Sequence, residues 1–205
     1  MGRPNQSAAR RSELLPRVAA TFAEHGYRRT TTALLAERCA VQEVILYRLW
    51  ADKRSMFLAA IEFVATNAEA IWARQLDTAA DDPRTAAEIV LDYEAEHLGE
   101  FGFYRILFAG LSETDDPQIT AGLRDAYRRF QAFLRARTTE HRAARAGAGR
   151  RRAGSASGRP DADATAWALL GLGTVVNLAR ELDLLPPAER AELLRRVGRL
   201  LLAGS

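Results

Sequence analysis

The stretch Gly26–Phe57, GYRRTTTALLAERCAVQEVILYRLWADKRSMF, decides the fold of this chain. Two short runs of helix-forming residues within it predict helices over 32–39 and 42–50. Few residues separate them, and the small side chain of Ala40 at the junction lets the two helices approach each other. Two short helices joined by a tight turn are typical of a DNA-reading helix-turn-helix, although an ordinary helical hairpin within a bundle has the same pattern.

The apolar residues of these two helices recur at a spacing that places them on one side. Those expected to face inward are Leu35, Ala36, Cys39, Val41 and Leu46. Tyr47 and Arg48 are then left on the outside of the second helix, where another molecule can reach them.

The whole chain predicts an all-α fold, because Ala, Leu, Arg and Glu dominate and alternating strand patterns are nearly absent. About nine helices are expected, over residues 12–25, 32–39, 42–50, 52–77, 81–99, 103–111, 115–145, 162–184 and 188–203. Pro16 would lie in the first turn of the first helix, and Gly26 would end that helix. Residues 146–160 are rich in Gly, Ala, Ser and Arg, which predicts a mobile loop.

Composition indicates a soluble globular protein of 205 residues, with 48% hydrophobic and 27% charged residues. The single cysteine, Cys39, excludes an intrachain disulfide and fits a reducing cytoplasm. The N-terminus lacks the apolar run of a signal peptide. The longest apolar stretch, 164–179, is short for a membrane span and contains Thr174 and Asn177. We therefore expect a cytoplasmic protein with no membrane partner.

Charge is unevenly distributed along the chain, although the net charge is only +3. Residues 1–60 carry ten basic and five acidic groups, whereas residues 61–142 carry nine and fifteen. A basic N-terminal third beside an acidic middle suggests that one end binds a polyanion, unless surface charge simply fluctuates along the chain. Lys53 is the only lysine among 29 basic residues, which indicates that its position favours a compact ammonium group.

Three segments near the N-terminus carry a family resemblance, which extends over residues 13–58: LLPRVAATFAEHGYRRTT, LLAERCAV and LYRLWADKRSMF. The first resembles the opening helix and the Phe-Ala-x-x-Gly-Tyr-x-x-Thr-Thr signature of the tetracycline-repressor (TetR) family of bacterial transcription regulators. The resemblance implies a helix-turn-helix DNA-binding domain with an N-terminal arm over 1–51, and a ligand-binding and dimerisation domain over 52–205. It also implies a homodimer, a palindromic double-stranded DNA operator, a small-molecule effector of unknown identity, and more often repression than activation.

Several residues match family positions that contact DNA. The resemblance implies that Thr31, Thr32, Tyr47 and Lys53 bind phosphates, although Lys53 can equally be a solvated helix end. The positions implied to face base edges are Glu43, Val44, Ile45 and Arg48. Arg3, in a flexible N-terminal arm, can enter an A·T-rich minor groove, or the arm is a tail without a role.

The second helix of the motif departs from the family pattern. Ala40 replaces the usual Gly and Gln42 the common Ser, while Val44 and Ile45 stand where Gly, Ala or Pro and Thr are common. Ile45 has no hydroxyl to donate to a phosphate, so we expect an unusual base preference. These departures favour an alternative function, in which a helical ligand-binding protein or enzyme retains a degenerate DNA-binding module.

The remaining two-thirds of the chain resemble the family only in helical outline. Apolar stripes in the last two helices predict a dimer interface, unless they complete a monomer core; its residues are Leu172, Val175, Val176, Leu193, Val197, Leu200 and Leu201. The resemblance implies an effector pocket, and its candidates, each of which can instead be an ordinary core or surface group, are Trp72, Tyr93, His97, Phe101, Tyr104, Phe108, Tyr127, Phe130, Trp167 and Asn177.

Catalytic signals are weak throughout the chain. His25, His97 and His141 lie far apart and show no metal-ligand spacing. Gly171-Leu172-Gly173 lacks the third glycine and the preceding strand of a dinucleotide-binding fold. We expect neither an enzyme, nor a cofactor, nor a bound metal.

Overall fold

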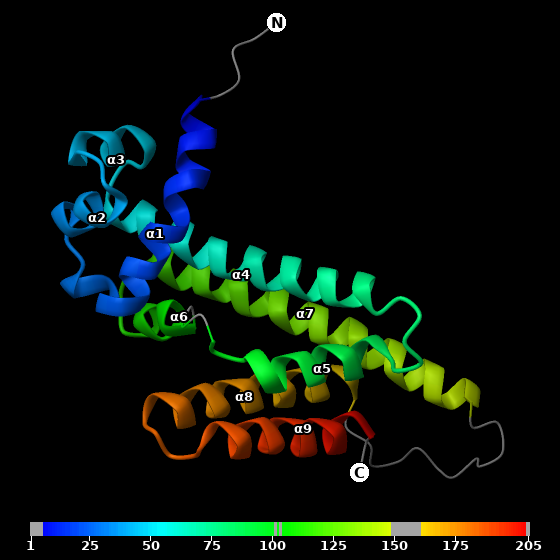
Figure 1. Cartoon of the computed structure of the whole chain (residues 1–205). Coiled ribbons are helices and arrows are strands. Elements are labelled where there is room, and N and C mark those ends of the chain that lie inside the picture. Colours follow the sequence, from blue (N-terminus) through cyan, green and yellow to red (C-terminus); the bar gives the residue numbers. More distant parts are fainter. Residues whose placement is uncertain (1–5, 101, 103, 149–160, 204–205) are drawn as a thin grey trace, which may run out of the picture. The chain divides into compact units, whose positions relative to one another are not determined.

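A computed structural model describes residues 6–100, 102, 104–148 and 161–203. Within these residues the chain forms helices and no strand (Figure 1), which confirms the all-α prediction. The helices are α1 (Gln6–Arg29), α2 (Thr32–Cys39), α3 (Glu43–Leu49), α4 (Lys53–Thr78), α5 (Ala86–His97), α6 (Tyr104–Leu111), α7 (Pro117–Ala148), α8 (Ala162–Glu181) and α9 (Pro187–Ala203). The predicted loop begins after Ala148, and its residues 149–160 lie outside the described part of the chain.

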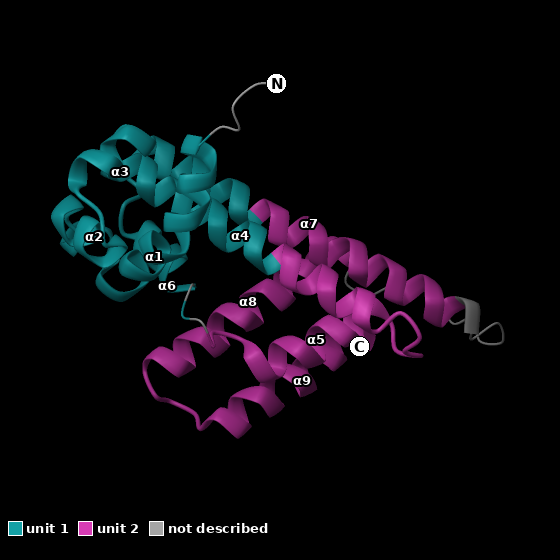
Figure 2. Cartoon of the chain, turned by 45° about the horizontal axis from the view of Figure 1, so that its top comes forward, with its two compact units in different colours: residues 1–68, 101–127 teal, residues 69–100, 128–205 magenta. Residues whose placement is uncertain are grey.

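The helices pack into two compact units, which Figure 2 colours separately. The first unit comprises residues 1–68 and 101–127, and the second comprises 69–100 and 128–205. The helix-turn-helix therefore shares its unit with α6 and with the first parts of α4 and α7. A division by packing thus groups more of the chain with the N-terminal helices than a boundary at residue 51 does.

The first helix is longer than the sequence predicts. It begins at Gln6 rather than Ser12, so Pro16 lies inside the helix and not in its first turn. The residues added at its start are good helix formers, and the missing N–H of Pro16 removes one backbone hydrogen bond without ending the helix. Gly26 does interrupt the helical backbone, with φ 71° and ψ 173°, as a glycine with left-handed freedom can.

The start of α5 corrects another expectation. Asp81, Asp82 and Pro83 were expected to open this helix, but they lie before it. Thr85 is the N-cap: its side chain accepts from the Glu88 backbone N–H, and the Glu88 carboxylate accepts from the Thr85 N–H at 2.9 Å. This reciprocal capping box satisfies two backbone donors at the helix start.

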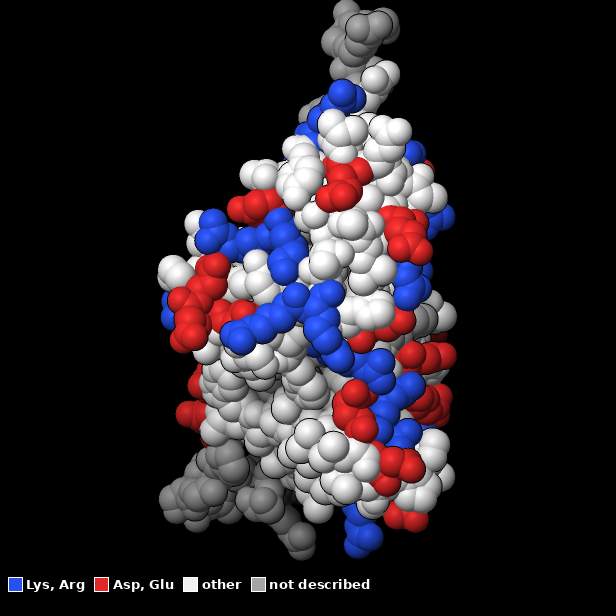
Figure 3. All heavy atoms as spheres, turned by 90° about the vertical axis from the view of Figure 1, so that its left-hand side faces the viewer, with Lys and Arg blue, Asp and Glu red and all other residues white. Residues whose placement is uncertain are grey.

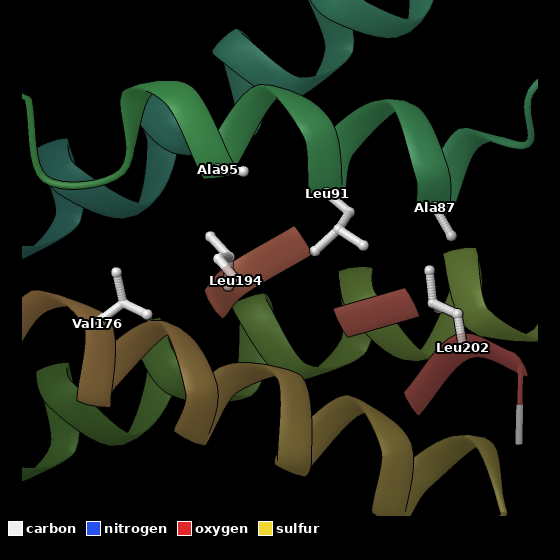
Figure 4. Packing of buried hydrophobic residues seen from close by; sticks show 6 residues of the cluster. All are labelled: Ala87, Leu91, Ala95, Val176, Leu194 and Leu202. Atoms are coloured by element: carbon white, nitrogen blue, oxygen red, sulfur yellow. The ribbon is translucent and has the colours of Figure 1, made fainter. Parts of the chain in front are cut away.

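The core of the second unit lies between α5, α8 and α9 (Figure 4). Its buried residues are Ala87, Leu91 and Ala95 from α5, Val176 from α8, and Leu194 and Leu202 from α9. Gly198 brings α9 very close to α5, because a Cβ built there would lie 2.4 Å from Leu91 Cδ1. A side chain at position 198 would therefore force Leu91 out of its place in the core.

Two helices, α4 and α8, are long and apolar enough to cross a membrane when judged by length and composition alone. Core helices of soluble proteins meet the same criterion, so the finding is weak evidence for a membrane. Only 28% of the apolar window in α8 is buried within this chain. Apolar surface on α8 therefore remains exposed.

Candidate nucleic-acid interface

Helix α2 is fixed at both ends by local capping. Thr31 is its N-cap, and the Thr31 hydroxyl accepts from the Leu34 N–H at 3.1 Å. At the other end Ala40 adopts a left-handed backbone, with φ 54° and ψ 45°. The N–H of Val41 then bonds the Ala36 carbonyl and that of Ala40 bonds the Glu37 carbonyl, which is a Schellman motif. An alanine here occupies a conformation that glycine adopts without strain.

Helix α3 begins without a side-chain cap, because Gln42 occupies the N-cap position and makes no capping hydrogen bond. Leu46 and Leu49 are buried and anchor the helix, while Glu43 and Arg48 are exposed. Val44 is 48% exposed and Tyr47 is 49% exposed. Ile45 is half-buried, so it contributes less to the outer face than its neighbours. The predicted outward position of Tyr47 and Arg48 is therefore confirmed.

Two of the side chains that the sequence assigns to phosphate contacts meet in the structure. The Tyr47 hydroxyl lies 3.2 Å from the Thr32 hydroxyl, which joins the start of α2 to the outer face of α3. Thr31 is adjacent, at the exposed N-terminus of α2. Hydroxyl groups and helix N–H groups converge here on one exposed surface, as a phosphate site requires.

Lys53 has partners inside the protein. Its Nζ donates to the Tyr27 carbonyl at 3.1 Å and lies 4.4 Å from the centre of the Tyr27 ring. Lys53 therefore holds the first residue of α4 against the last turn of α1. Asp52, just before it, accepts from the Ser55 N–H at 2.7 Å, and this bond lowers the pKa of the Asp52 carboxyl.

Two arginines of α1 bind the ends of the reading helices. Arg11 donates to the carbonyl of Leu49, the last residue of α3, and its guanidinium lies 5.7 Å from the centre of the Trp50 ring. Arg17 donates to the carbonyl of Cys39, the last residue of α2, at 3.4 Å. A cation at a helix C-terminus satisfies an unpaired carbonyl and opposes the negative end of the helix dipole.

Arg48 differs from the other basic residues of the N-terminal third. Of the described Lys and Arg residues up to residue 60, Arg48 alone makes no hydrogen bond or ion pair within the chain. The ion pairs of the others are Arg10–Glu13, Arg28–Glu113, Arg38–Glu24, Arg54–Asp52 and Arg54–Asp116. Figure 3, seen from the side of α2 and α3, accordingly shows basic side chains interspersed with acidic ones.

The predicted pocket residues fall into separate groups. In the second unit, the Trp72 ring lies 5.8 Å from Phe130 and 4.5 Å from Phe133, and Tyr93 stacks on His97 at 4.3 Å. Asn177, also in this unit, is 7% exposed, and its side-chain oxygen has no hydrogen-bond partner.

The other pocket candidates do not join this group. Tyr104, Phe108 and Tyr127 belong to the first unit, where the Tyr104 and Phe108 rings lie 5.5 Å apart. Trp167 is 49% exposed on α8, which separates it from the aromatic core. Phe101, like Arg3 of the N-terminal arm, lies outside the described residues.

Glu94 is a candidate that sequence reasoning missed. Its carboxylate accepts a hydrogen bond from the Trp72 indole Nε1 at 2.5 Å, and burial raises the pKa of the carboxyl. A signal was present in the sequence: Glu94 follows buried Val90 by four residues, which places an acidic group on an inward face of α5.

The residues assigned to dimerisation also separate by exposure. An outward stripe of α8 is entirely apolar and consists of Ala164, Trp167, Ala168, Gly171, Val175, Leu178 and Leu182. Val175 is 55% and Leu182 is 60% exposed, and Leu200 of α9 is 59% exposed. Val176 instead points into the core of its own chain, so it is not available to a partner (Figure 4).

The described chain was compared with known proteins. Residues 18–60, which cover most of α1, α2, α3 and the start of α4, match the sequence model of the bacterial regulatory proteins of the tetR family. No curated protein matches the chain.

Many solved structures share the fold. A TetR-family transcriptional regulator from Cytophaga hutchinsonii superposes with a TM-score of 0.75 at 13% identity, covering 98% of this chain and 97% of that one. A TetR-family regulator from Agrobacterium tumefaciens has a TM-score of 0.69 at 14% identity, with 94% and 97% covered. A protein from Saccharomonospora viridis described as a transcriptional regulator, solved in complex with choline, has a TM-score of 0.68 at 18% identity, with 96% of each chain covered.

Proposed function

This chain is a DNA-binding transcriptional regulator of the tetR family of bacterial proteins, and we propose that it is a cytoplasmic homodimeric repressor that a small molecule releases from its operator. The observation that carries the proposal is the outer face of α3. Its exposed side chains include Glu43, Val44, Tyr47 and Arg48, and the guanidinium of Arg48 is unpaired. An unpaired arginine on a helix of this motif is suited to bind guanine O6 and N7 with both of its terminal nitrogens.

The proposed roles follow the geometry. Arg48 reads a base, while Glu43, Val44 and Ile45 contact neighbouring base edges, with Ile45 restricted to apolar contact by its half-buried position. Thr31, Thr32 and Tyr47 bind one phosphate, supported by the 3.2 Å contact between the two hydroxyls of Thr32 and Tyr47. Lys53 binds another phosphate, and Arg3 extends the contact into a minor groove.

Dimerisation is supported by the apolar stripe on α8. A row of exposed apolar side chains along a whole helix is rare on a monomer surface and is typical of an interface. We propose that the stripe packs against the same stripe of a second copy, joined by Leu193, Val197, Leu200 and Leu201 of α9. Two-fold symmetry then presents two copies of α3 to half-sites about 34–36 Å apart, which is why the operator would be palindromic.

Ligand response is supported by the aromatic groups and by the packing of the first unit. The functional boundary that we propose lies between residues 51 and 52. Helix α1 nevertheless packs on α6, and the loop after α6 is tied to α1 and α4 by Arg28–Glu113 and Arg54–Asp116. Movement of α6 or of the start of α7 would therefore shift the reading helices. An effector that favours one spacing of the two α3 helices changes DNA affinity by its differential affinity for the two states.

The test is a titration of the protein against the DNA upstream of its own coding sequence at several salt concentrations. Nanomolar, sequence-selective binding supports the proposal, and Arg48→Ala should then relax preference at one base pair at a cost of about 1–3 kcal/mol. Weak binding that ignores sequence would instead favour a helical ligand-binding protein or enzyme with a degenerate DNA-binding module. The uncapped α3 and the apolar Val44 and Ile45 are the features that favour this second function.

A further inference from the structure

Glu94 is an acidic group among aromatic rings in the second unit. One carboxylate oxygen accepts the Trp72 indole N–H at 2.5 Å. On the same helix, the Glu94 charge also acts on the Tyr93 hydroxyl, and it contributes to the raised pKa of that phenol. Glu94, Tyr93, His97 and Phe133 each keep part of their surface exposed, so this group of side chains is within reach of solvent.

The chain does not supply a cation to Glu94. Among the described residues no Lys or Arg pairs with it, and the basic group that acts on its carboxyl is His97. The two nearest arginines of α7 are engaged elsewhere, because Arg129 forms an ion pair with Glu69 and Arg137 forms one with Glu140. An ionised carboxylate removed from water is costly unless it is paired, which is the reason that burial raises the pKa of Glu94.

Aromatic faces surround the position where a counter-charge would sit. Trp72 contacts both Phe130 and Phe133, with ring centres 5.8 Å and 4.5 Å apart. One of these rings already binds a cation, since the Arg137 guanidinium lies 5.5 Å from the centre of Phe133. Aromatic faces attract cations through the ring quadrupole, and they also bury apolar groups.

From these contacts we infer that Glu94, Trp72, Tyr93 and Phe133 recognise a hydrophobic monocation, with Glu94 as its counter-charge. The ligand class is an ammonium or substituted amine that carries an aromatic or alkyl group. The positive charge pairs with the Glu94 carboxylate, and the apolar part packs on the rings of Trp72 and Phe133. This inference names the effector class and therefore rests on the proposed ligand response.

The experiment measures binding directly by titration calorimetry on the full chain without DNA. The probes are benzyltrimethylammonium and protonated phenylethylamine, together with the neutral carbon isostere of the first. Glu94→Gln keeps the shape of the side chain and an oxygen that can accept the Trp72 N–H. Glu96→Gln on the same helix is the matched control, since Glu96 is 61% exposed at its side chain and pairs only with Arg195 on the surface.

The wild-type protein should bind at least one of the two cations and bind the neutral isostere weakly. Glu94→Gln should weaken cation binding by about 30-fold or more, as expected when one partner of a desolvated charge pair is removed, while Glu96→Gln leaves it unchanged. Failure of both cations to bind, equal binding of the isostere, or unchanged affinity in Glu94→Gln would each overturn the inference.

A second measurement separates this inference from the proposed function. The cation is added to the complex of wild-type protein with its operator DNA, and DNA release is followed by fluorescence anisotropy. Cation binding that depends on Glu94 but leaves DNA affinity unchanged supports the ligand class and contradicts ligand-released repression. DNA that is released by other small molecules but not by a cation keeps the repressor function and overturns the ligand class.

Discussion

Replacing Lys53 by methionine separates the two roles of this residue. Methionine keeps an unbranched apolar stem and removes the ammonium group, which lies 3.1 Å from the Tyr27 carbonyl and 4.4 Å from the centre of its ring. A hydrogen bond from a charged donor contributes about 1.5 kcal/mol at the lower end of its range, and an exposed cation–π contact about 0.5 kcal/mol. We therefore expect the free energy of unfolding to fall by about 2 kcal/mol, measured by urea denaturation.

The DNA-binding effect of the same change is read from the salt dependence. Each phosphate contact contributes about 0.9 to the slope of log affinity against log salt, so the loss of one contact in each protomer of a dimer lowers the slope by about 1.8. Fluorescence anisotropy with an operator duplex and with an unrelated duplex, from roughly 50 to 200 mM salt, gives both slopes. Lys53→Met should weaken binding to the two duplexes by the same factor, because a phosphate contact carries no sequence information.

Arg74→Met is the matched control, because Arg74 is an exposed cation on the same helix, 21 residues further along. It removes the same charge at a distance of about 30 Å from position 53. Its slope should equal that of the wild type. A Lys53→Met protein that loses affinity with an unchanged slope would refute the phosphate contact and leave Lys53 with only its role at the end of α1.

Three further changes test other parts of the structure. Ala40→Gly relieves a left-handed alanine and should raise the free energy of unfolding by about 1 kcal/mol in urea denaturation, and a loss of stability would contradict the strain. Val175→Arg should convert the dimer to monomers in sedimentation velocity and weaken operator binding with little effect on protomer folding, while Thr139→Arg on the exposed face of α7 changes neither; a Val175→Arg dimer would exclude the α8 stripe as the interface. Burial raises the pKa of Glu94, so the folded chain holds this proton above the ordinary glutamate range of about 4.3, and ionisation costs stability as pH rises through that range. Glu94→Gln should therefore gain stability relative to the wild type between acidic and neutral pH, and a difference that does not change with pH would show that the carboxyl is not destabilised.

Elements with local end signals were predictable from the sequence. Helix α2 has the predicted bounds of 32–39, because Thr31 caps its start and the chain turns at Ala40. The start of α5 was misassigned because two local signals competed. Asp82-Pro83 resembles a helix start, but the capping box between Thr85 and Glu88 satisfies more backbone donors and prevails.

The exposed face of α3 was predictable for a similar reason, since helical periodicity alone decides which residues point outward. Partners distant in sequence were not. Lys53 meets Tyr27, 26 residues earlier, and Arg11 meets Leu49, 38 residues later. Such contacts depend on how whole helices pack, and no local pattern encodes that packing. The same limit applies to Glu94, whose inward position is visible in the sequence although its Trp72 partner is not.

The charge of the N-terminal third has a different meaning once these contacts are known. Ten basic residues in the first 60 suggest many phosphate contacts, yet Arg11 and Arg17 bind helix ends and several others pair with carboxylates. Exposed ion pairs are weak and can open toward DNA, whereas the arginines at the helix ends are needed to hold α2 and α3 in place. Much of the basic charge therefore builds the reading surface. Arg48, which has no partner in the described chain, is the side chain that this arrangement leaves available to the bases.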